Sequence, residues 1–300
     1  MRPITGRDEL DLFNRHPYGL NEELADDLAT GRRRPEWTWV ALRGDRLLAR
    51  VAWWCQAGAD TPFLLDVFDF DDDNVDVGEQ LLRTAMAEVV PAGNRPPEYI
   101  RMVPPDWRDS AKREVEDRMG VLERAGAHLF VERLRFEWRP GTPVPEPTGR
   151  LAFRQVRDTE EIVTLMTEVL DGTLDAHGRD DLTRMSAREA AVRHYEDELA
   201  HYRTPRDWWR IATLPDGEPV GFVTPARNDY NPIIGYIAVL PRHRGNGYID
   251  DILAEGTRVL TAQDVPRIRA ATDLGNTPMA NAFLRAGYVN FERSINMTWH

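Results

Sequence analysis

Residues 233–260 read IIGYIAVLPRHRGNGYIDDILAEGTRVL, and this stretch decides the fold expected for the chain. Its first eight residues are uncharged and rich in β-branched side chains, which predicts a buried strand. Pro241 ends that strand because proline has no N–H to donate. A basic turn with two glycines follows, and from Tyr248 the apolar residues recur at helical spacing. A glycine turn that leads into a helix N-terminus offers converging N–H groups to an anion. The stretch therefore predicts a phosphate or pyrophosphate site.

The composition indicates a soluble globular protein. The chain has 300 residues, of which 42% are hydrophobic and 29% charged, and its net charge is −12. Such an acidic chain lacks the basic face of a nucleic-acid binder, so we expect no nucleic-acid partner. No uncharged apolar run approaches the length of a membrane span, and residues 1–13 lack the apolar core of a signal peptide. The only cysteine, Cys55, cannot form an internal disulfide. We expect a cytoplasmic protein without membrane association, as a monomer or a homodimer.

The two halves of the chain share an order of predicted elements. Each shows a helical start, a hairpin, a third strand, a helix, a strand, a second helix and a closing strand. Between the halves, residues 139–149 read RPGTPVPEPTG, with four prolines and two glycines. This composition predicts an interdomain linker. The expected organisation is a domain at residues 1–139, a linker at 140–149 and a second domain at 150–300.

The basic turn carries the first of two family motifs. The pattern Arg242-x-x-Gly245-x-Gly247 stands after an apolar strand and before a helix. In this position it resembles motif A of the GNAT superfamily of N-acetyltransferases. Motif A holds the pyrophosphate of coenzyme A, which agrees with the anion site inferred from the glycines and the helix N-terminus.

A second motif lies downstream at the spacing that the family shows. Asn276 is followed by Met279, Phe283 and the pair Gly287-Tyr288. This pattern resembles motif B of the superfamily, an asparagine and a helix that closes with Gly-Phe or Gly-Tyr. The resemblance covers nearly all of residues 151–300.

The resemblance implies an α/β (α+β) fold of two GNAT-like domains. Each would have a mixed, mainly antiparallel central sheet with splayed parallel strands, flanked by helices. It also implies acetyl-CoA as co-substrate, held in a V between the strands at residues 235–240 and 268–272. The implied contacts of the cofactor are Ile237, Ala238, Val239, Leu240, Arg242, Arg244, Gly245, Asn246, Gly247, Tyr248, Asn276 and Phe283.

These contacts have different implied roles. The N–H groups of residues 242–248 would hold the pyrophosphate, and the backbone of Val239 and Leu240 would pair with the pantetheine arm. The N–H of Ile237 or Ala238 would face the thioester carbonyl. Arg244 is favoured over Arg242 as a phosphate contact.

The N-terminal half offers Asp71-Asp72-Asp73-Asn74 at the position of motif A. Clustered carboxylates would repel a pyrophosphate. We therefore expect this half to be a degenerate copy that does not bind coenzyme A.

Family members often have a tyrosine where this chain has Phe283, and that tyrosine protonates the leaving thiolate. Phe283 has no proton to give. Either another residue protonates the thiolate, or the thiolate leaves unassisted, or the C-terminal copy binds coenzyme A without strong catalysis. The candidate catalytic residues, for deprotonating the amine or relaying its proton, are Tyr236, on the central strand, and Asp273, at the end of the second splayed strand. Tyr236 could equally be a packed strand tyrosine, and Asp273 could equally cap the turn at Asn276.

The expected acceptor is a primary amine of a small molecule. Asp171, Asp175 and Asp229 lie in polar segments that could bind it. His194 and His201 lack a third ligand, so we expect no metal site. The expected function is an acetyl-CoA-dependent N-acetyltransferase with an active C-terminal domain, by direct attack of the amine. Two alternatives stay open: an acyltransferase for a thiol-pathway metabolite, and a non-catalytic acyl-CoA-binding or regulatory module.

Overall fold

The stretch that decides the fold forms a strand and a helix at the predicted places. The strand is β10 (Pro232–Val239) and the helix is α9 (Tyr248–Thr261). The computed structural model describes residues 1–299. α9 is amphipathic, and its buried face includes Ile252, Leu253 and Leu260. The helical spacing of these apolar residues, which the sequence showed, is the spacing that packs on the sheet.

The chain divides into two compact units, which are described separately. Unit 1 comprises Met1–Glu132 and the chain from Arg293 onward, and unit 2 comprises Arg133–Glu292. Both boundaries lie inside long strands, β6 (Ala127–Trp138) and β12 (Val289–Trp299). The proline-rich residues 139–149 lie within unit 2.

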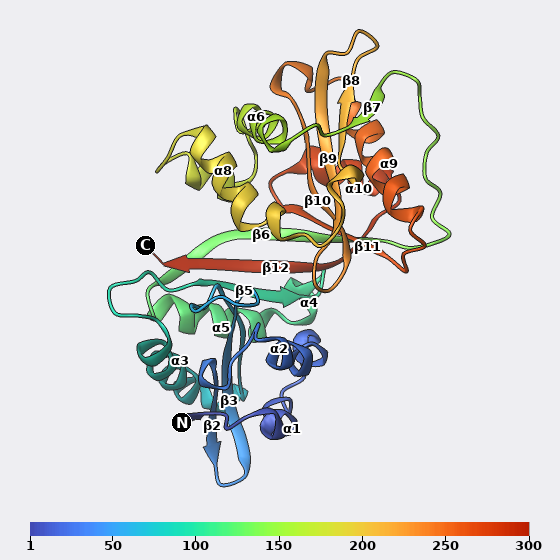
Figure 1. Cartoon of the computed structure of the whole chain (residues 1–300). Helices are drawn as coiled ribbons and strands as arrows, with labels where there is room; N and C mark the ends of the chain where they lie inside the picture. Colours follow the sequence, from blue (N-terminus) through green and yellow to red (C-terminus); the bar gives the residue numbers. More distant parts are fainter. Residues whose placement is uncertain (300) are drawn as a thin grey trace. The chain divides into compact units, whose positions relative to one another are not determined.

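Unit 2 has a mixed sheet with the strand order β6-β11-β10-β9-β8-β7 (Figure 1). Its pairs are antiparallel except for β10 and β11, which are parallel. The other elements of this unit are β7 (Ala152–Gln155), α6 (Thr159–Val169), α7 (Ala176–Asp181), α8 (Ala187–Asp197), β8 (Arg210–Thr213), β9 (Pro219–Arg227), β11 (Ile268–Asp273) and α10 (Thr277–Arg285).

Helices cover both faces of the unit 2 sheet. In Figure 1, α9 and α10 lie on one side of the strands, and α6 and α8 lie on the other. Successive strand residues point to opposite faces. Ile237 and Val239 therefore pack in the cluster that contains α9 and α10, while Tyr236 and Ala238 pack in the cluster that contains α6 and α8.

Unit 1 has the strand order β1-β2-β3-β4-β5-β12, with a parallel pair at β4 and β5. Two apolar clusters cover its faces, one with α3 and α5 and the other with α1 and α2 (Figure 1). Its elements are β1 (Arg2–Pro3), α1 (Leu10–Phe13), α2 (Leu24–Thr30), β2 (Thr38–Arg43), β3 (Arg46–Trp54), β4 (Leu64–Phe70), α3 (Val75–Val89), β5 (Glu98–Val103), α4 (Trp107–Ser110) and α5 (Lys112–Arg124). The expected fold class is confirmed, since both units have mixed, mainly antiparallel sheets flanked by helices.

The proline-rich segment is fastened to unit 2. Thr142 lies so close to Gly287 that a Cβ at position 287 would stand 2.4 Å from its Cγ2 atom. The carbonyl of Pro145 accepts a hydrogen bond from Arg258 of α9 at 2.9 Å. Thr148 donates to Asp251 at 2.7 Å. These contacts hold the segment along α9.

Candidate active site

β10 bends at Gly235. Its register with β9 shifts between Ile234 and Tyr236, which marks a β-bulge. The hydroxyl of Thr224 fills the gap in the ladder, because it accepts from the N–H of Tyr236 at 2.7 Å and donates to its carbonyl at 3.3 Å. A Cβ at position 235 would lie 2.8 Å from Cε2 of Tyr202. The bend therefore depends on glycine and on one threonine hydroxyl.

The two parallel strands separate after this point. β10 and β11 pair at Ile233 and Arg269, near the start of both strands. On its other side β10 stays paired with β9 as far as Val239 opposite Gly221. β10 thus has one satisfied edge and one edge that opens toward the gap between the strands. The V that the family resemblance implies is therefore present in the structure.

The direction of the backbone groups on β10 follows from one bond. The N–H of Leu240 donates to the carbonyl of Val220 on β9 at 2.8 Å. Backbone groups alternate sides along a strand, so the N–H of Ala238 also faces β9. The N–H groups of Ile237 and Val239 face the open edge. Of the two expected donors to a thioester carbonyl, the geometry favours Ile237.

The turn after β10 has the backbone of an anion site. Gly245 and Gly247 have φ values of 80° and 71°, a left-handed conformation that favours glycine. Gly247 is the N-cap of α9. The first N–H groups of α9 therefore have no acceptor within the helix. The Asn246 side chain braces the turn by donating to the carbonyls of His243 and Arg244 at 3.1 and 3.3 Å.

Arg244 links α6 to the open edge of β10. Its Nε donates to the carbonyl of Val239 at 3.2 Å. Its Nη1 donates to the carbonyls of Asp171 and Gly172, at 2.7 and 3.2 Å, and its Nη2 donates to that of Val169 at 2.8 Å. The guanidinium thus caps the C-terminal end of α6. A phosphate contact through Arg244 would require these bonds to break.

Arg242 is engaged in a different direction. It forms ion pairs with Glu168 at 2.8 Å and Glu218 at 3.0 Å. The ring of His243 also lies 3.0 Å from Glu218. Both basic side chains therefore hold the outside of the turn against α6 and the start of β9, and the glycine N–H groups supply the cradle.

Asp273 is a buried carboxylate at the end of β11, with 3% of its surface exposed. Its Oδ2 accepts from the N–H of Ala176 at 2.6 Å, and its Oδ1 lies 3.0 Å from Nε of Arg133. Burial and the neighbouring Asp175 raise the pKa of Asp273, and Arg133 opposes that rise. Asp175 itself caps α7 through Gly178 at 2.7 Å and lies 3.9 Å from Arg133. One oxygen of Asp273 thus holds the start of α7, and the other forms an ion pair with Arg133 of β6.

Tyr236 lies on the sheet face that α8 covers. Its ring stacks with His194, with ring centroids 4.9 Å apart and an interplanar angle of 25°, and meets Phe222 edge-on at 5.1 Å. Burial, together with the carboxylates of Asp175 and Glu198, raises the pKa of Tyr236 above the ordinary value of a phenol. A phenol that keeps its proton at neutral pH is a poor general base.

Glu198 joins His194 to Tyr202. α8 ends at Asp197, and Glu198 leaves the helical geometry as its C-cap. Its carboxylate lies 3.3 Å from Nε2 of His194 and accepts from the hydroxyl of Tyr202 at 2.6 Å. Loss of solvent opposes ionisation of Glu198, but these two contacts lower its pKa. His194 was expected only as part of an incomplete metal-ligand pair with His201, although its spacing of one helical turn from Glu198 is visible in the sequence.

α10 presents an apolar side chain where the family often has tyrosine. Asn276 caps this helix by accepting from the N–H of Met279 at 3.3 Å. Phe283 is 1% exposed and stacks on Phe136 with centroids 5.0 Å apart. Tyr288 donates to or accepts from Thr257 at 2.8 Å inside the core. Neither Phe283 nor Tyr288 is placed as an acid at the open edge.

The other expected acceptor contacts lie apart. Asp171 is exposed after α6 and gives its carbonyl to Arg244. Asp229 lies in the loop before β10 and pairs with Arg203 at 2.7 Å. Since that loop enters β10 at the end opposite the glycine turn, Asp229 and Asp171 are not brought together. Of the three expected acidic contacts, Asp175 is the one beside Asp273.

In unit 1 the corresponding strands also separate, but side chains fill the space. β4 and β5 pair at Leu64 and Leu65, the first residues of β4. Beyond them, Nε of Arg118 on α5 donates to the carbonyl of Phe68 at 3.2 Å, and its Nη2 to Asp69 at 3.2 Å. In this unit, therefore, a backbone carbonyl of β4 already accepts a hydrogen bond from a guanidinium.

Asp69 is the centre of a buried ionic cluster. Arg50 and Arg101 approach it at 2.8 and 2.9 Å, in addition to Arg118. Burial alone would raise the pKa of Asp69, but Arg101, Arg50 and Arg118 hold it well below its usual range. Asp69, Arg50, Arg101 and Arg118 are therefore structural partners of one another in unit 1.

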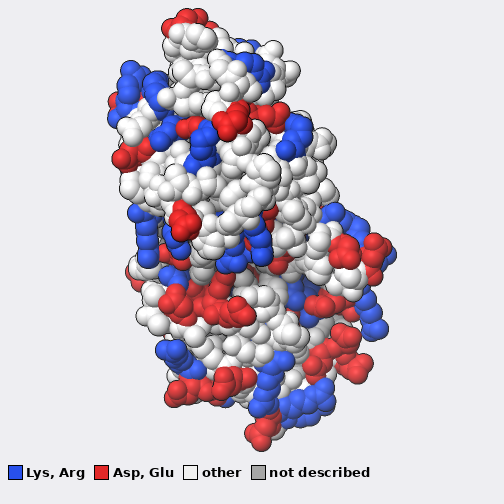
Figure 2. All heavy atoms as spheres, turned by 90° about the vertical axis from the view of Figure 1, so that its right-hand side faces the viewer, with Lys and Arg blue, Asp and Glu red and all other residues white. Residues whose placement is uncertain are grey.

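The surface charge, the metal-ligand geometry and the helices of the described chain each add one observation. Figure 2 shows one face of the molecule, on which acidic and basic side chains are interspersed. Within residues 1–299, no three side chains of the His, Cys, Asp and Glu types converge as metal ligands. In the same range every helix is too short or too polar to cross a bilayer.

Comparisons with known proteins agree with this geometry. Residues 150–289 match the family model described as the acetyltransferase (GNAT) domain. This part of the chain is therefore a GNAT acetyltransferase domain. A search of curated proteins found no match.

Solved structures extend the likeness over both units. A GCN5-related N-acetyltransferase from Sphaerobacter thermophilus aligns with a TM-score of 0.58 at 16% identity, over 96% of this chain and 88% of that chain. A tandem GNAT protein from the clavulanic acid biosynthesis pathway aligns with a TM-score of 0.55 at 16% identity, over 99% and 97%. A GCN5-related N-acetyltransferase from Kribbella flavida aligns with a TM-score of 0.53 at 15% identity, over 98% and 96%. The chain has the tandem GNAT fold.

Proposed function

We propose that this protein is an acetyl-CoA-dependent N-acetyltransferase that acetylates a primary amine of a small molecule. The C-terminal GNAT domain, residues 150–289, would carry the activity, and the N-terminal copy, residues 1–139, would serve as a structural partner. The observation that carries the proposal is the open edge of β10 next to the glycine turn before α9. One edge can pair with an extended pantetheine arm, and the turn can receive its diphosphate.

The residues present fit acetyl-CoA, which would supply the activated acetyl group. The N–H of Ile237 faces the open edge and would donate to the thioester oxygen as negative charge develops there. The N–H groups of Gly247 and Tyr248 would hold the diphosphate. The Val239 carbonyl, now bonded to Arg244, would become an acceptor for a pantetheine amide once that bond is exchanged.

His194 is the group that we assign as the general base. Tyr236 holds its proton, and both oxygens of Asp273 are engaged, so neither sequence candidate is free to take one. His194 lies over Tyr236 beside the bulge, and Glu198 fixes its Nε2. The Nδ1 atom would accept the proton that the amine loses as its nitrogen bonds to the thioester carbon and the C–S bond breaks. The imidazolium would then return that proton through water to the thiolate.

Nearby charge favours a cationic acceptor. Glu198 pairs with His194, which stacks on Tyr236. Besides burial, the carboxylates of Asp175 and Glu198 raise the pKa of Tyr236, while Arg244 opposes them. Two carboxylates there would draw in an ammonium group, which would give one proton to water before the neutral amine attacks. A small amine is therefore a better fit than an acidic metabolite.

A second candidate function is a non-catalytic acyl-CoA-binding module. The observation that favours it is Phe283, which is buried and cannot protonate a thiolate. The two functions separate in one experiment. Acetyl-CoA is offered with diamines, amino sugars and aromatic amines, and released thiol and coenzyme A affinity are both measured. Thiol release with any amine supports the transferase, whereas tight binding without thiol release supports the module.

The cofactor assignment has its own test. Gly247→Trp places a bulky side chain at a left-handed position in the cradle, so coenzyme A affinity should fall sharply. Gly217→Trp, in a surface hairpin of the same unit with the same sign of φ, is the matched control. Unchanged affinity in Gly247→Trp would overturn the assignment.

A further inference from the structure

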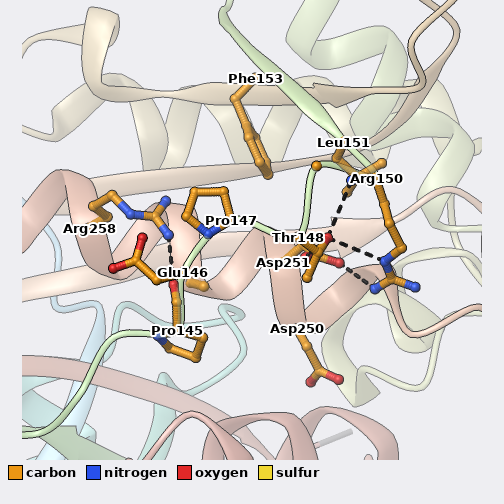
Figure 3. A pocket seen from close by; sticks show the side chains of 12 residues that line it. Pro145, Glu146, Pro147, Thr148, Arg150, Leu151, Phe153, Asp250, Asp251 and Arg258 are labelled. Carbon is orange, nitrogen blue, oxygen red and sulfur yellow. Dashed lines mark hydrogen bonds and ion pairs between the residues drawn. The ribbon is translucent and has the colours of Figure 1, made fainter.

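The proline-rich segment encloses a pocket against α9. The pocket has a volume of about 250 Å³ and lies between residues 145–151 and the first half of the helix (Figure 3). Two arginines close it from opposite ends. Arg258 holds the carbonyl of Pro145, and Arg150 holds Thr148 and Asp251. The two arginines thus fasten one segment, but only Arg150 reaches the glycine turn.

Arg150 contacts the turn through its backbone carbonyls. Its Nη1 donates to the carbonyl of Asn246 at 3.2 Å, and its Nη2 to that of Gly247 at 3.4 Å. Its guanidinium also lies over the ring of Tyr248, 5.3 Å from the centroid. Arg150 therefore binds the back of the turn in three places.

These contacts, together with the hydrogen bond from the N–H of Asp250 to the carbonyl of Gly247 at 3.2 Å, hold the peptide units of the turn in one orientation. In a trans peptide the carbonyl and the N–H of the same unit point in opposite directions, and the chain has no cis peptide bond among its described residues. The carbonyl of Asn246 shares its peptide unit with the N–H of Gly247, and the carbonyl of Gly247 shares its unit with the N–H of Tyr248. Because both carbonyls face Arg150, both N–H groups face away from it.

Arg150 also neutralises a charge that would oppose an anion. Asp251 lies in the first turn of α9, and its side chain is 8% exposed. A carboxylate at a helix N-terminus competes with an anionic ligand for the same N–H groups and the same dipole. The ion pair with Arg150 and the hydrogen bond from Thr148 remove that competition.

We propose that Arg150 is a positioning residue for the diphosphate of acetyl-CoA. It orients the N–H groups of Gly247 and Tyr248 and screens Asp251, without touching the cofactor itself. This inference rests on the proposed function, because it assigns a role toward the cofactor that the function requires. From the proline-rich segment, Thr148 supports this role through its bonds to Asp251 and Arg150.

The test compares ligands with and without a diphosphate on the full-length protein. Coenzyme A affinity is measured by calorimetry, and pantetheine affinity by NMR titration. Arg150→Gln should weaken coenzyme A binding about tenfold or more, and should leave pantetheine binding within about twofold. Arg258→Gln is the matched control, since it releases the same segment at the other end, and its coenzyme A affinity should match the wild type.

Charge rescue separates positioning from simple loss of structure. Adding Asp251→Asn to Arg150→Gln removes the unscreened carboxylate, so a large part of the coenzyme A affinity should return. Equal losses for coenzyme A and pantetheine, or equal losses in Arg150→Gln and Arg258→Gln, would overturn the inference while leaving the proposed function in place. A wild-type protein that binds no coenzyme A would overturn both.

Discussion

The imidazole of His194 stacks on the phenol ring of Tyr236, with ring centroids 4.9 Å apart and planes inclined by 25°. His194 comes from α8 and Tyr236 from β10, the strand whose open edge we propose for the cofactor. Glu198 fixes the imidazole from the other side. This contact puts a titratable base beside the bulge of β10, and the first prediction tests it.

His194→Gln removes the base but keeps a polar side chain of similar reach. If His194 takes the amine proton, kcat should fall by about 10²- to 10⁴-fold while coenzyme A affinity is unchanged. Steady-state rates and coenzyme A titrations of the wild type and the variant measure both quantities. His201→Gln, an exposed histidine on the following turn, is the control, and equal rate losses in the two variants would contradict the assignment.

Phe283→Tyr restores the residue that the family often uses, yet we expect no gain in rate. The ring is 1% exposed between Phe136 and Tyr288, so an added hydroxyl would be buried among aromatic rings. A buried hydroxyl without a partner should cost about 1–3 kcal/mol of unfolding free energy. Urea unfolding and the turnover rate measure the two quantities. A higher kcat with unchanged stability would show that this ring reaches the thiolate after all.

Gly235→Ala and Gly221→Ala should differ in severity. At position 221 the added Cβ would lie 2.3 Å from the carbonyl oxygen of Ala238, which the β-ladder holds in place. That clash should cost about 3 kcal/mol or more. At position 235 the clash is with the ring end of Tyr202, which can rotate away. Gly235→Ala should therefore lose about 1 kcal/mol in unfolding free energy.

The rotation of Tyr202 has a functional consequence. Its hydroxyl bonds Glu198, so moving it should lower kcat in Gly235→Ala through the His194 contact. Tyr202→Ala combined with Gly235→Ala should recover stability but not rate. Thermal melts and rates for the single and double variants decide the point, and recovery of both would rule out a role for Tyr202.

Asp69→Asn should destabilise unit 1 strongly. The substitution leaves Arg50, Arg101 and Arg118 buried around a neutral amide, and breaking such a buried pair costs about 3–5 kcal/mol. The pKa of Asp69 is depressed in the folded state, so its contribution is complete above the unfolded pKa of about 3.9 and is lost as pH falls below it. The stability difference between wild type and variant should therefore shrink from pH 5 toward pH 2. A constant difference across that range would show that the charge of Asp69 is not responsible.

Most secondary structure could be predicted because its signals are local. The apolar run before Pro241, the glycines of the turn and the helical spacing after Tyr248 each act over a few residues. β10 and α9 accordingly appear where they were predicted. The exact end of a helix is less local: α8 ends at Asp197, because the end of a helix depends on what it packs against.

The residues of the site were predicted only in part. The backbone N–H donors of β10 could be predicted, because N–H groups alternate sides along a strand and the motif shows which residues form the strand. Side-chain partners depend on distant segments. Arg244 was expected to contact phosphate, yet its guanidinium binds the end of α6, and no local signal in the sequence indicated that Arg133 pairs with Asp273. The contact between His194 and Tyr236 joins positions 42 residues apart, and no local pattern reports it.

The stretch at residues 233–260 separates what local sequence signals determine from what long-range packing determines. The sequence by itself determined the strand, the left-handed glycines, the helix and the resemblance to a GNAT acetyltransferase, because these depend on backbone preferences and apolar periodicity within the stretch. Only the tertiary structure decided that β10 separates from β11, that Arg244 faces α6, and that Arg150 holds the turn from behind. Those outcomes come from packing between segments far apart in the chain, where the free energy depends on which surfaces meet.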